Sequence, residues 1–550
     1  MSEPYYYSDE AARLQVLLEE VTRARPGSPE NRFIKPDGSV LDRLASSFHH
    51  VVYGRRGTGK SSLLRHIEAE RTADQHLVAW ADQETYMGLE YPDVLVSTLA
   101  DSFADFAEQL RKRDAADGAR ERTRQWRRRQ STEVGQVASQ LEHAVAQLLS
   151  LKQMPSESQI EWTASFSQQA THSRQTDSDV GAAKGWFSLK WGRNKRSERS
   201  AASGEQLSQR FVATKAEHLE KAVPTYRALM KSVTKVSSDS FIILDDFYRL
   251  REDDQPRIAG YLHRSVKDTG VWLKLGSIRY WTRLYAGGSP SFGLQVPHDI
   301  RELTLDRNLP DFNTSKRFLE QILEALAEEA GVDTSALFSD GARDRLVLAS
   351  GGVARDYIGL ASESIAIAKN RGPSAKAGTE RVIAEDINEA AGRTVDVKYA
   401  DLEEDAGADA AELRELVIEL TTHCRRTRSA CFLVDFRDKN LVTQMNRLQN
   451  MRFVHAIDSN ESLPDQHSSR YNVYVLDVSQ LAAQRAWQVD FMGWTKREKR
   501  RARKLVFPNV EGESAISARG EQEQEPEQLS IDDALAVVGS VDPPVESPSP

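Results

Sequence analysis

Gly54-Arg55-Arg56-Gly57-Thr58-Gly59-Lys60-Ser61 is the stretch of sequence that decides the fold. It matches the pattern G-x-x-x-x-G-K-[ST], with the apolar run His50-Val51-Val52-Tyr53 before it and a helical pattern after it. Glycines let such a loop wrap a phosphate group with backbone N–H groups, while the lysine reaches the β- and γ-phosphate oxygens and the serine hydroxyl ligates a metal ion. The expected cofactors are therefore ATP and Mg²⁺. The expected nucleotide-binding residues are Gly54, Arg55, Arg56, Gly57, Thr58, Gly59, Lys60, Ser61 and Ser62.

A second motif supplies the carboxylates that this chemistry needs. Residues 241–244 are apolar, and Asp245 and Asp246 follow them directly. We expect Asp245 and the hydroxyl of Ser61 to hold Mg²⁺, directly or through water, and Asp246 to polarise the attacking water, with Lys60 as a further catalytic group. The side chain of Asp246 is one methylene shorter than a glutamate at the same position would be. We therefore expect ATP hydrolysis to be slow, which suits a switch rather than a motor.

Strands and helices alternate around these two motifs. Short apolar runs predict strands at residues 50–53, 77–81, 241–244, 272–276 and 303–305. Helical patterns occur at residues 8–24, 40–47, 94–110, 206–233 and 255–267, and after the strand at 50–53. Such alternation predicts a parallel sheet that is covered by helices on both faces. After Pro310 the pattern is helical to about residue 397.

The order of these motifs resembles that of AAA+ P-loop ATPases. The resemblance rests on the phosphate loop, on Leu244-Asp245-Asp246, on residues 272–279 and on Ser350-Gly351-Gly352-Val353-Ala354-Arg355 in the helical part. It is closest to the clade of origin-recognition and replication-loader proteins and to their STAND relatives, and it covers residues 40–400 without the insertion described below. The resemblance implies an ATPase core followed by a helical lid.

The same resemblance implies roles for residues outside the two motifs. In these proteins a polar residue that ends the strand after the Asp-Asp strand senses the γ-phosphate, which here falls on Ser277, with Arg279 as the competing choice. An arginine of the lid senses the γ-phosphate from the other side, which falls on Arg355. An arginine finger would come from the end of the helix before the sensor strand, which falls on Arg264.

The chain departs from a compact AAA+ core because Lys60 and Asp245 are 185 positions apart. We interpret residues 112–205 as an insertion, and two of the three basic clusters of the chain fall in or beside it, at residues 111–129 and 181–200. Residues 186–196 interleave aromatic and basic residues. This composition suits stacking on nucleic-acid bases and pairing with phosphates, or binding to an anionic membrane surface, but it is equally compatible with a plain interaction loop. Each cluster alone is also compatible with a solvated helix face or loop.

Residues 401–508 form a separate C-terminal pattern. Two helices at 411–424 and 440–449 precede two strands at 452–457 and 471–476, an order typical of a winged helix. In the origin-recognition clade a winged helix follows the lid and binds duplex DNA, so the resemblance implies DNA as a partner. The third basic cluster, residues 496–504, would contact phosphates without reading sequence. Winged helices also mediate protein contacts, so a protein partner remains open.

Composition excludes several classes of protein. The 550 residues are 39% hydrophobic, and no apolar run approaches the roughly 20 residues that span a bilayer. The N-terminus does not resemble a secretory signal, so we expect a cytoplasmic protein. Cys424 and Cys431 are too few for a disulfide framework or a zinc site, and we expect buried thiols. Protease, α/β-hydrolase and zinc motifs do not occur.

The net charge of −9 comes from the C-terminal tail. Residues 511–550 hold ten acidic residues and one basic residue, so the rest of the chain is neutral overall. The tail is rich in proline and poor in aromatic residues, a composition that predicts disorder.

The sequence therefore predicts five segments and a switch-like ATPase. The segments are an N-terminal helical segment (1–40), an AAA+ ATPase core with an insertion (41–310), a helical lid (311–400), a winged-helix-like α+β domain (401–508) and a disordered acidic tail (509–550). The first hypothesis couples a slow Mg²⁺-dependent ATP cycle to nucleic acid, as in replication, transposition or phage defence. The alternative is a STAND-like signalling scaffold that forms an ATP-dependent homo-oligomer and recruits a partner protein. A small-molecule kinase is disfavoured because it would not need the lid and the winged helix.

Overall fold

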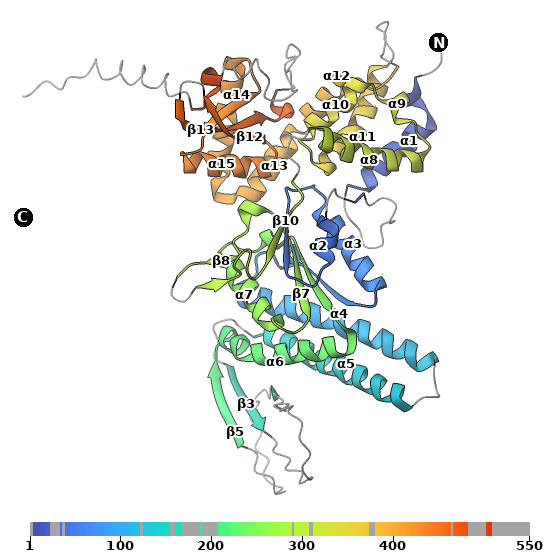
Figure 1. Cartoon of the computed structure of the whole chain (residues 1–550), viewed down its shortest axis with the longest axis vertical. Helices are drawn as coiled ribbons and strands as arrows, with labels where there is room; N and C mark the ends of the chain where they lie inside the picture. Colours follow the sequence, from blue (N-terminus) through green and yellow to red (C-terminus); the bar gives the residue numbers. More distant parts are fainter. Residues whose placement is uncertain are drawn as a thin grey trace, which may run out of the picture.

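The computed structural model is elongated, with the sheet domain in the middle of its long axis (Figure 1). A central sheet domain carries the helical lid and the C-terminal domain at one end and a helical arm at the other. The structure describes residues 4–22, 34–35, 39–120, 125–154, 160–166, 187–188, 207–288, 291–306, 312–372, 380–463, 466–481 and 502–508. The predicted disordered tail lies outside these residues.

The central sheet has five parallel strands in the order β10-β1-β7-β6-β2. Its strands are β1 (His50–Tyr53), β2 (Leu77–Asp82), β6 (Ser240–Asp245), β7 (Val271–Ser277) and β10 (Arg301–Thr304). Successive residues of β6 point to opposite faces: Ile243 packs with α2 (Val40–Ala45) and α3 (Lys60–Ala73), whereas Ile242 and Leu244 pack with the helices of the other face. Because both faces are covered, β2 and β6 are apolar at most positions, whereas the edge strand β10 buries only Leu303. The predicted fold class is confirmed.

The other face of the sheet is covered by helices that continue into the arm. Helices α4 (Tyr91–Arg120), α6 (Lys215–Ser237) and α7 (Gln255–Val266) contact the strands, and α5 (Gln125–Lys152) packs on α4 and α6. Helices α4 and α5 form a hairpin that projects from the sheet domain, and an antiparallel ribbon of β3 (Ile160–Phe166), β4 (Phe187–Ser188) and β5 (Leu207–Ala213) follows it (Figure 1). Most of the basic cluster at 181–200 lies outside the described residues.

The predicted start of the helix at residues 206–233 is wrong in the structure. The helix expected at residues 206–233 begins only at Lys215, because residues 207–213 form strand β5 and pair with β3. Thr214 ends the strand and caps the helix: its side chain accepts a hydrogen bond from the Glu217 N–H, and the Glu217 carboxylate accepts one from the Thr214 N–H. This reciprocal cap is a T-x-x-E signal that marks the true start of the helix.

The lid is a helical body with its own core. It contains α8 (Phe312–Ala330), α9 (Thr334–Leu337), α10 (Asp340–Ala349), α11 (Ala354–Arg371) and α12 (Ala384–Arg393). Helix α1 (Asp9–Glu20), from the far N-terminus, packs in the same core through Leu14 and Leu18. The N-terminal helix therefore completes the lid.

The C-terminal domain has the helices and the hairpin that the winged-helix interpretation requires. It contains α13 (Val395–Ala406), α14 (Ala410–Thr427), β11 (Cys431–Asp435), α15 (Lys439–Asn450), β12 (Val454–Leu463) and β13 (Gln466–Leu476). Strand β11 joins the hairpin to give an antiparallel sheet in the order β11-β13-β12. Cys424 and Cys431 are buried free thiols of this domain, as expected. In the part of the chain described above, no helix is long and apolar enough to cross a bilayer.

Candidate nucleotide-binding site

The phosphate loop joins the end of β1 to the first turn of α3, as the motif requires. Gly57 (φ 85°) and Gly59 (φ 92°) adopt left-handed backbone conformations that side chains disfavour. A Cβ atom on Gly54 would lie 2.4 Å from the Thr58 hydroxyl oxygen, so this glycine lets the loop close on itself. The Lys60 Nζ lies inside the loop, where it donates to the carbonyl oxygens of Gly54 (2.8 Å) and Arg55 (3.1 Å).

The predicted Mg²⁺ ligands lie together beside the loop. Asp245 ends β6 and is 5% exposed, and its carboxylate accepts hydrogen bonds from the Ser61 hydroxyl and from the Asp246 N–H (3.0 Å). Burial, and then the charge of Asp246, raise the pKa of Asp245 to about 6, while Ser61 and Lys60 oppose that shift. A buried carboxylate and a hydroxyl fit a hard cation such as Mg²⁺, which prefers oxygen ligands. The ion would offset the charge that burial disfavours.

Further carboxylates gather at the same edge of the sheet. The carboxylates of Asp82, Glu84 and Asp246 lie within 4.8 Å of one another. Asp82 is the last residue of β2 and pairs in register with Asp245, and Glu84 lies in the short turn that follows. Asp82 and Glu84 were not predicted, although an acid directly after an apolar strand is the same signal that identified Asp245. Burial raises the pKa of Asp246, and the nearby Lys60 ammonium opposes this.

Of the two sensor candidates, Ser277 is the one that contacts the loop. Its carbonyl oxygen accepts a hydrogen bond from the Gly54 N–H (3.2 Å), and its buried hydroxyl is hydrogen-bonded to Thr282. The Arg279 guanidinium pairs instead with Glu302 at 2.7 Å. Ser277 therefore contacts the loop through its backbone, and its role as a sensor stays a prediction.

The two predicted arginines lie in different surroundings. Arg355, in the first turn of α11, donates its backbone N–H to the Gly57 carbonyl (3.1 Å), and its side chain donates to the Thr22 carbonyl (3.0 Å). It therefore lies against the phosphate loop. Arg264 forms a two-armed ion pair with Glu220 of α6, with both N–O distances at 2.8 Å. Within this single chain, the Arg264 side chain therefore contacts α6 and is not directed at the phosphate loop.

The second and third residues of the loop have partners far away in the sequence. Arg55 contacts Asp306, Gly351 of the lid and His455 of the C-terminal domain, and Arg56 pairs with Asp401 of α13 at 3.5 Å. Sequence reasoning identified neither Asp306 nor His455, because nothing in a linear pattern relates residues 250 or more positions apart to the loop. The candidate nucleotide-binding site therefore lies where the sheet domain, the lid and the C-terminal domain meet.

The sheet, the loop after β1 and the helical body together have the arrangement of a P-loop fold. No protein-family model and no curated protein sequence matches the chain. Among solved structures, the chain is similar to the Aeropyrum pernix ORC1 protein in complex with DNA, at 15% identity and a TM-score of 0.36, over 85% of this chain and 94% of that one. It is also similar to the Walker-type ATPase paby2304 of Pyrococcus abyssi, at 10% identity and a TM-score of 0.40, over 84% and 98%. At this identity and TM-score, the similarity does not indicate an activity. An activity can be inferred only from the residues of this chain.

Proposed function

We propose that this protein is a Mg²⁺-dependent ATPase of the AAA+ type, in which the nucleotide controls how the domains are arranged. The observation that carries the proposal is the hydrogen bond between Ser61 and the buried Asp245, directly beside a phosphate loop that holds Lys60. In P-loop enzymes this set of groups binds and polarises a nucleoside triphosphate.

Each group has a task in the proposed reaction. Backbone N–H groups of the loop bind phosphate oxygens. When the nucleotide binds, the Lys60 ammonium donates to phosphate oxygens in place of the carbonyl oxygens of Gly54 and Arg55. Ser61 and Asp245 would hold Mg²⁺, which supplies positive charge to the β- and γ-phosphates. Asp246 accepts a hydrogen bond from the attacking water and orients it.

The proposed partner is nucleic acid. This is supported by the helix–hairpin arrangement of the C-terminal domain and by the basic clusters of the sequence, above all residues 496–504. Contacts of this kind release counterions from the nucleic acid, so binding would weaken steeply with salt. The alternative partner is a protein recruited by an ATP-dependent homo-oligomer.

One experiment tests both parts of the proposal. Phosphate release is measured with and without duplex and single-stranded DNA at two salt concentrations, for the wild type, Lys60→Ala and Asp246→Asn, with the exposed Lys235→Ala as the control for lysine removal. We expect Mg²⁺-dependent turnover that both site variants lose and that the control keeps. Stimulation by DNA that fades with salt supports the nucleic-acid role, and indifference to DNA supports the signalling scaffold. A wild type that binds no nucleotide contradicts the proposal.

A further inference from the structure

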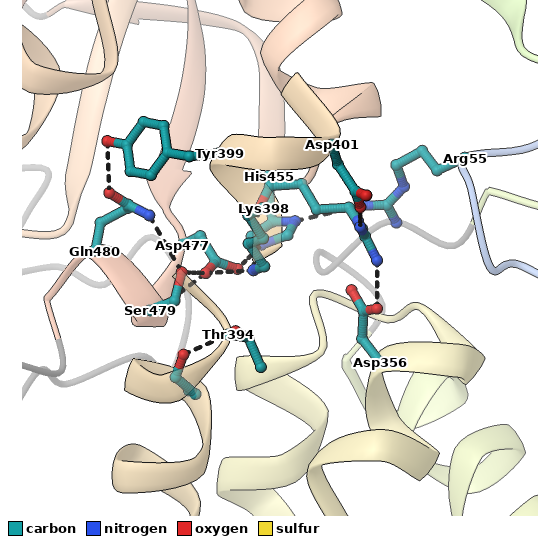
Figure 2. A network of polar contacts seen from close by, with 12 residues as sticks. Arg55, Asp356, Thr394, Lys398, Tyr399, Asp401, His455, Asp477, Ser479 and Gln480 are labelled. Atoms are coloured by element: carbon teal, nitrogen blue, oxygen red, sulfur yellow. Dashed lines mark hydrogen bonds and ion pairs between the residues drawn. The ribbon is translucent and has the colours of Figure 1, made fainter. Parts of the chain in front are cut away.

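Arg55 is a buried arginine in a loop that otherwise wraps a phosphate group. Its residue is 2% exposed, although arginine is almost never fully buried unless it is paired. The guanidinium is directed toward the lid and the C-terminal domain: Nη2 donates to the Gly351 carbonyl (3.0 Å), and Nη1 lies 3.2 Å from His455 Nδ1 (Figure 2). The Arg55 side chain therefore connects the sheet domain to both the lid and the C-terminal domain.

The donors and acceptors of the hydrogen bonds around His455 can be assigned without ambiguity. A guanidinium can only donate, so His455 Nδ1 accepts from Arg55 and the ring proton is on Nε2. Nε2 lies 2.9 Å from Asp477 Oδ2 and donates to it, and the other oxygen of Asp477 accepts from Lys398 at 2.7 Å. Burial lowers the pKa of His455, in keeping with a neutral ring. Each member of this series is therefore paired although it is buried.

Arg56, the next residue of the loop, also contacts the C-terminal domain. Arg56 pairs with Asp401 of α13, and the other oxygen of Asp401 accepts from Arg452 at 2.7 Å. Arg452 also pairs with Asp356 of the lid helix α11 (Figure 2). Two successive residues of the phosphate loop are thus held by side chains of the C-terminal domain.

The backbone of Arg55 in turn holds the loop. Its N–H donates to Asp306 Oδ1 (2.8 Å), and its carbonyl oxygen accepts from the Thr58 N–H (3.2 Å) and from Lys60 Nζ (3.1 Å). The anchored side chain therefore fixes the orientation of the peptide group on which the rest of the loop is organised. A loop that is fixed before the ligand arrives loses less entropy when it binds, which favours tighter binding.

We infer that Arg55 and His455 are positioning residues for the nucleotide: the C-terminal domain holds the phosphate loop in its binding conformation through the bond from Arg55 to His455 Nδ1. The inference rests on the proposed function. Coupling of this kind is reciprocal, so the nucleotide stabilises the docked C-terminal domain by the same factor by which the docked domain strengthens nucleotide binding.

The test compares two replacements of one histidine. In His455→Asn an amide oxygen takes the position of Nδ1 and can still accept from Arg55, whereas His455→Gln places its amide near Nε2, beside Asp477. The dissociation constant of a fluorescent ATP analogue with Mg²⁺, and the KM and kcat for ATP, are measured for both variants and for Arg55→Met. Arg414→Met removes an exposed ion pair of the same domain and is the control.

We expect Arg55→Met and His455→Gln to weaken nucleotide binding at least tenfold, equivalent to about 1.4 kcal/mol, with kcat changed much less than KM. His455→Asn and Arg414→Met should stay within threefold of the wild type. The double variant Arg55→Met/His455→Gln should bind no more weakly than the weaker single variant, because both remove the same bond. Hydrogen exchange at β12 should slow when nucleotide is added to the wild type but not to Arg55→Met.

Three results would overturn the inference: Arg55→Met binds nucleotide as the wild type does, the two histidine variants lose affinity equally, or the double variant shows additive losses. If Arg55→Met does not fold, as judged by circular dichroism, the histidine pair and the exchange measurement decide. Failure of the proposed function is seen separately, because then the wild type binds nucleotide no better than Lys60→Ala.

Discussion

Gly351 lies where the lid meets the C-terminal domain, and we predict that Gly351→Ala disrupts this contact. The residue is buried, has φ of 57°, and a Cβ atom built on it would lie 2.0 Å from Cε1 and 2.4 Å from Nδ1 of His455. Ordinary contact begins at 3.4 Å. The ring and the glycine would have to separate by the difference, about 1.4 Å.

Two costs add up at this position. A left-handed backbone costs an alanine about 1–2 kcal/mol, and overpacking a buried contact costs about 1–3 kcal/mol. The expected loss of stability is therefore about 2–5 kcal/mol. At about 2–4 °C per kcal/mol for a unit of 150–250 residues, this corresponds to a fall in Tm of roughly 4–20 °C.

The same lid offers a matched control. Gly359 lies inside helix α11, and a Cβ atom there meets no heavy atom within 4 Å, so Gly359→Ala should stabilise the helix by about 0.5–1 kcal/mol. The two variants are compared by thermal unfolding and by nucleotide affinity, which only Gly351→Ala should weaken through displacement of the His455 ring. If Gly351→Ala matches Gly359→Ala in both measurements, the close contact between lid and C-terminal domain does not exist as described.

Further predictions concern a carboxylate, an arginine and the thiols. The pKa of Asp245 is raised to about 6, so the folded state binds a proton more tightly than the unfolded chain does, and stability from this group is lost as pH rises from about 4 to about 6. Asp245→Asn should therefore raise the free energy of unfolding by about 3 kcal/mol at pH 8 and by about half of that at pH 5, while Mg²⁺-dependent nucleotide binding is lost. A gain in stability that does not change with pH in calorimetry would contradict this. Arg264→Ala should cost at most about 1 kcal/mol, because its pair with Glu220 is half exposed. If Arg264 acts as a finger on a neighbouring copy, phosphate release should fall by about 10³ with nucleotide affinity unchanged, and an equal fall in Glu220→Gln would argue against it. Neither Cys424 nor Cys431 should react with a thiol reagent until denaturant unfolds the domain, and burial also raises the pKa of Cys424; fast labelling of the native protein would speak against a buried pair.

The sheet could be predicted because its signals are local. Strands buried on both faces appear as apolar runs, and the acids that follow them, such as Asp245, identify the edge where the phosphate loop lies. The five predicted strands of the central sheet lie within one or two residues of those observed, whereas the C-terminal hairpin strands β12 and β13 are longer than predicted. Strand β5 was missed because its residues were merged into the following helix, although Thr214 and Glu217 mark the boundary between the two.

The surroundings of the loop could not be predicted, because they depend on how distant segments pack. Arg55 occupies a position of the motif that accepts any residue, and its partner His455 is 400 positions away. Asp306 and Gly351 come from two other segments. A local pattern identifies which atoms bind phosphate, but not which domain holds those atoms in place.

The bond between Arg55 and His455 also sets an order of events during biosynthesis. At about 5–20 residues per second, the ribosome needs roughly 20–80 s to add the 400 residues that separate the two partners. During that interval the β1 strand and the phosphate loop have been made, but the side chain that accepts from Arg55 has not. A nascent chain therefore holds its ATP-binding motif without the final support, and completes that support only when the last large domain emerges.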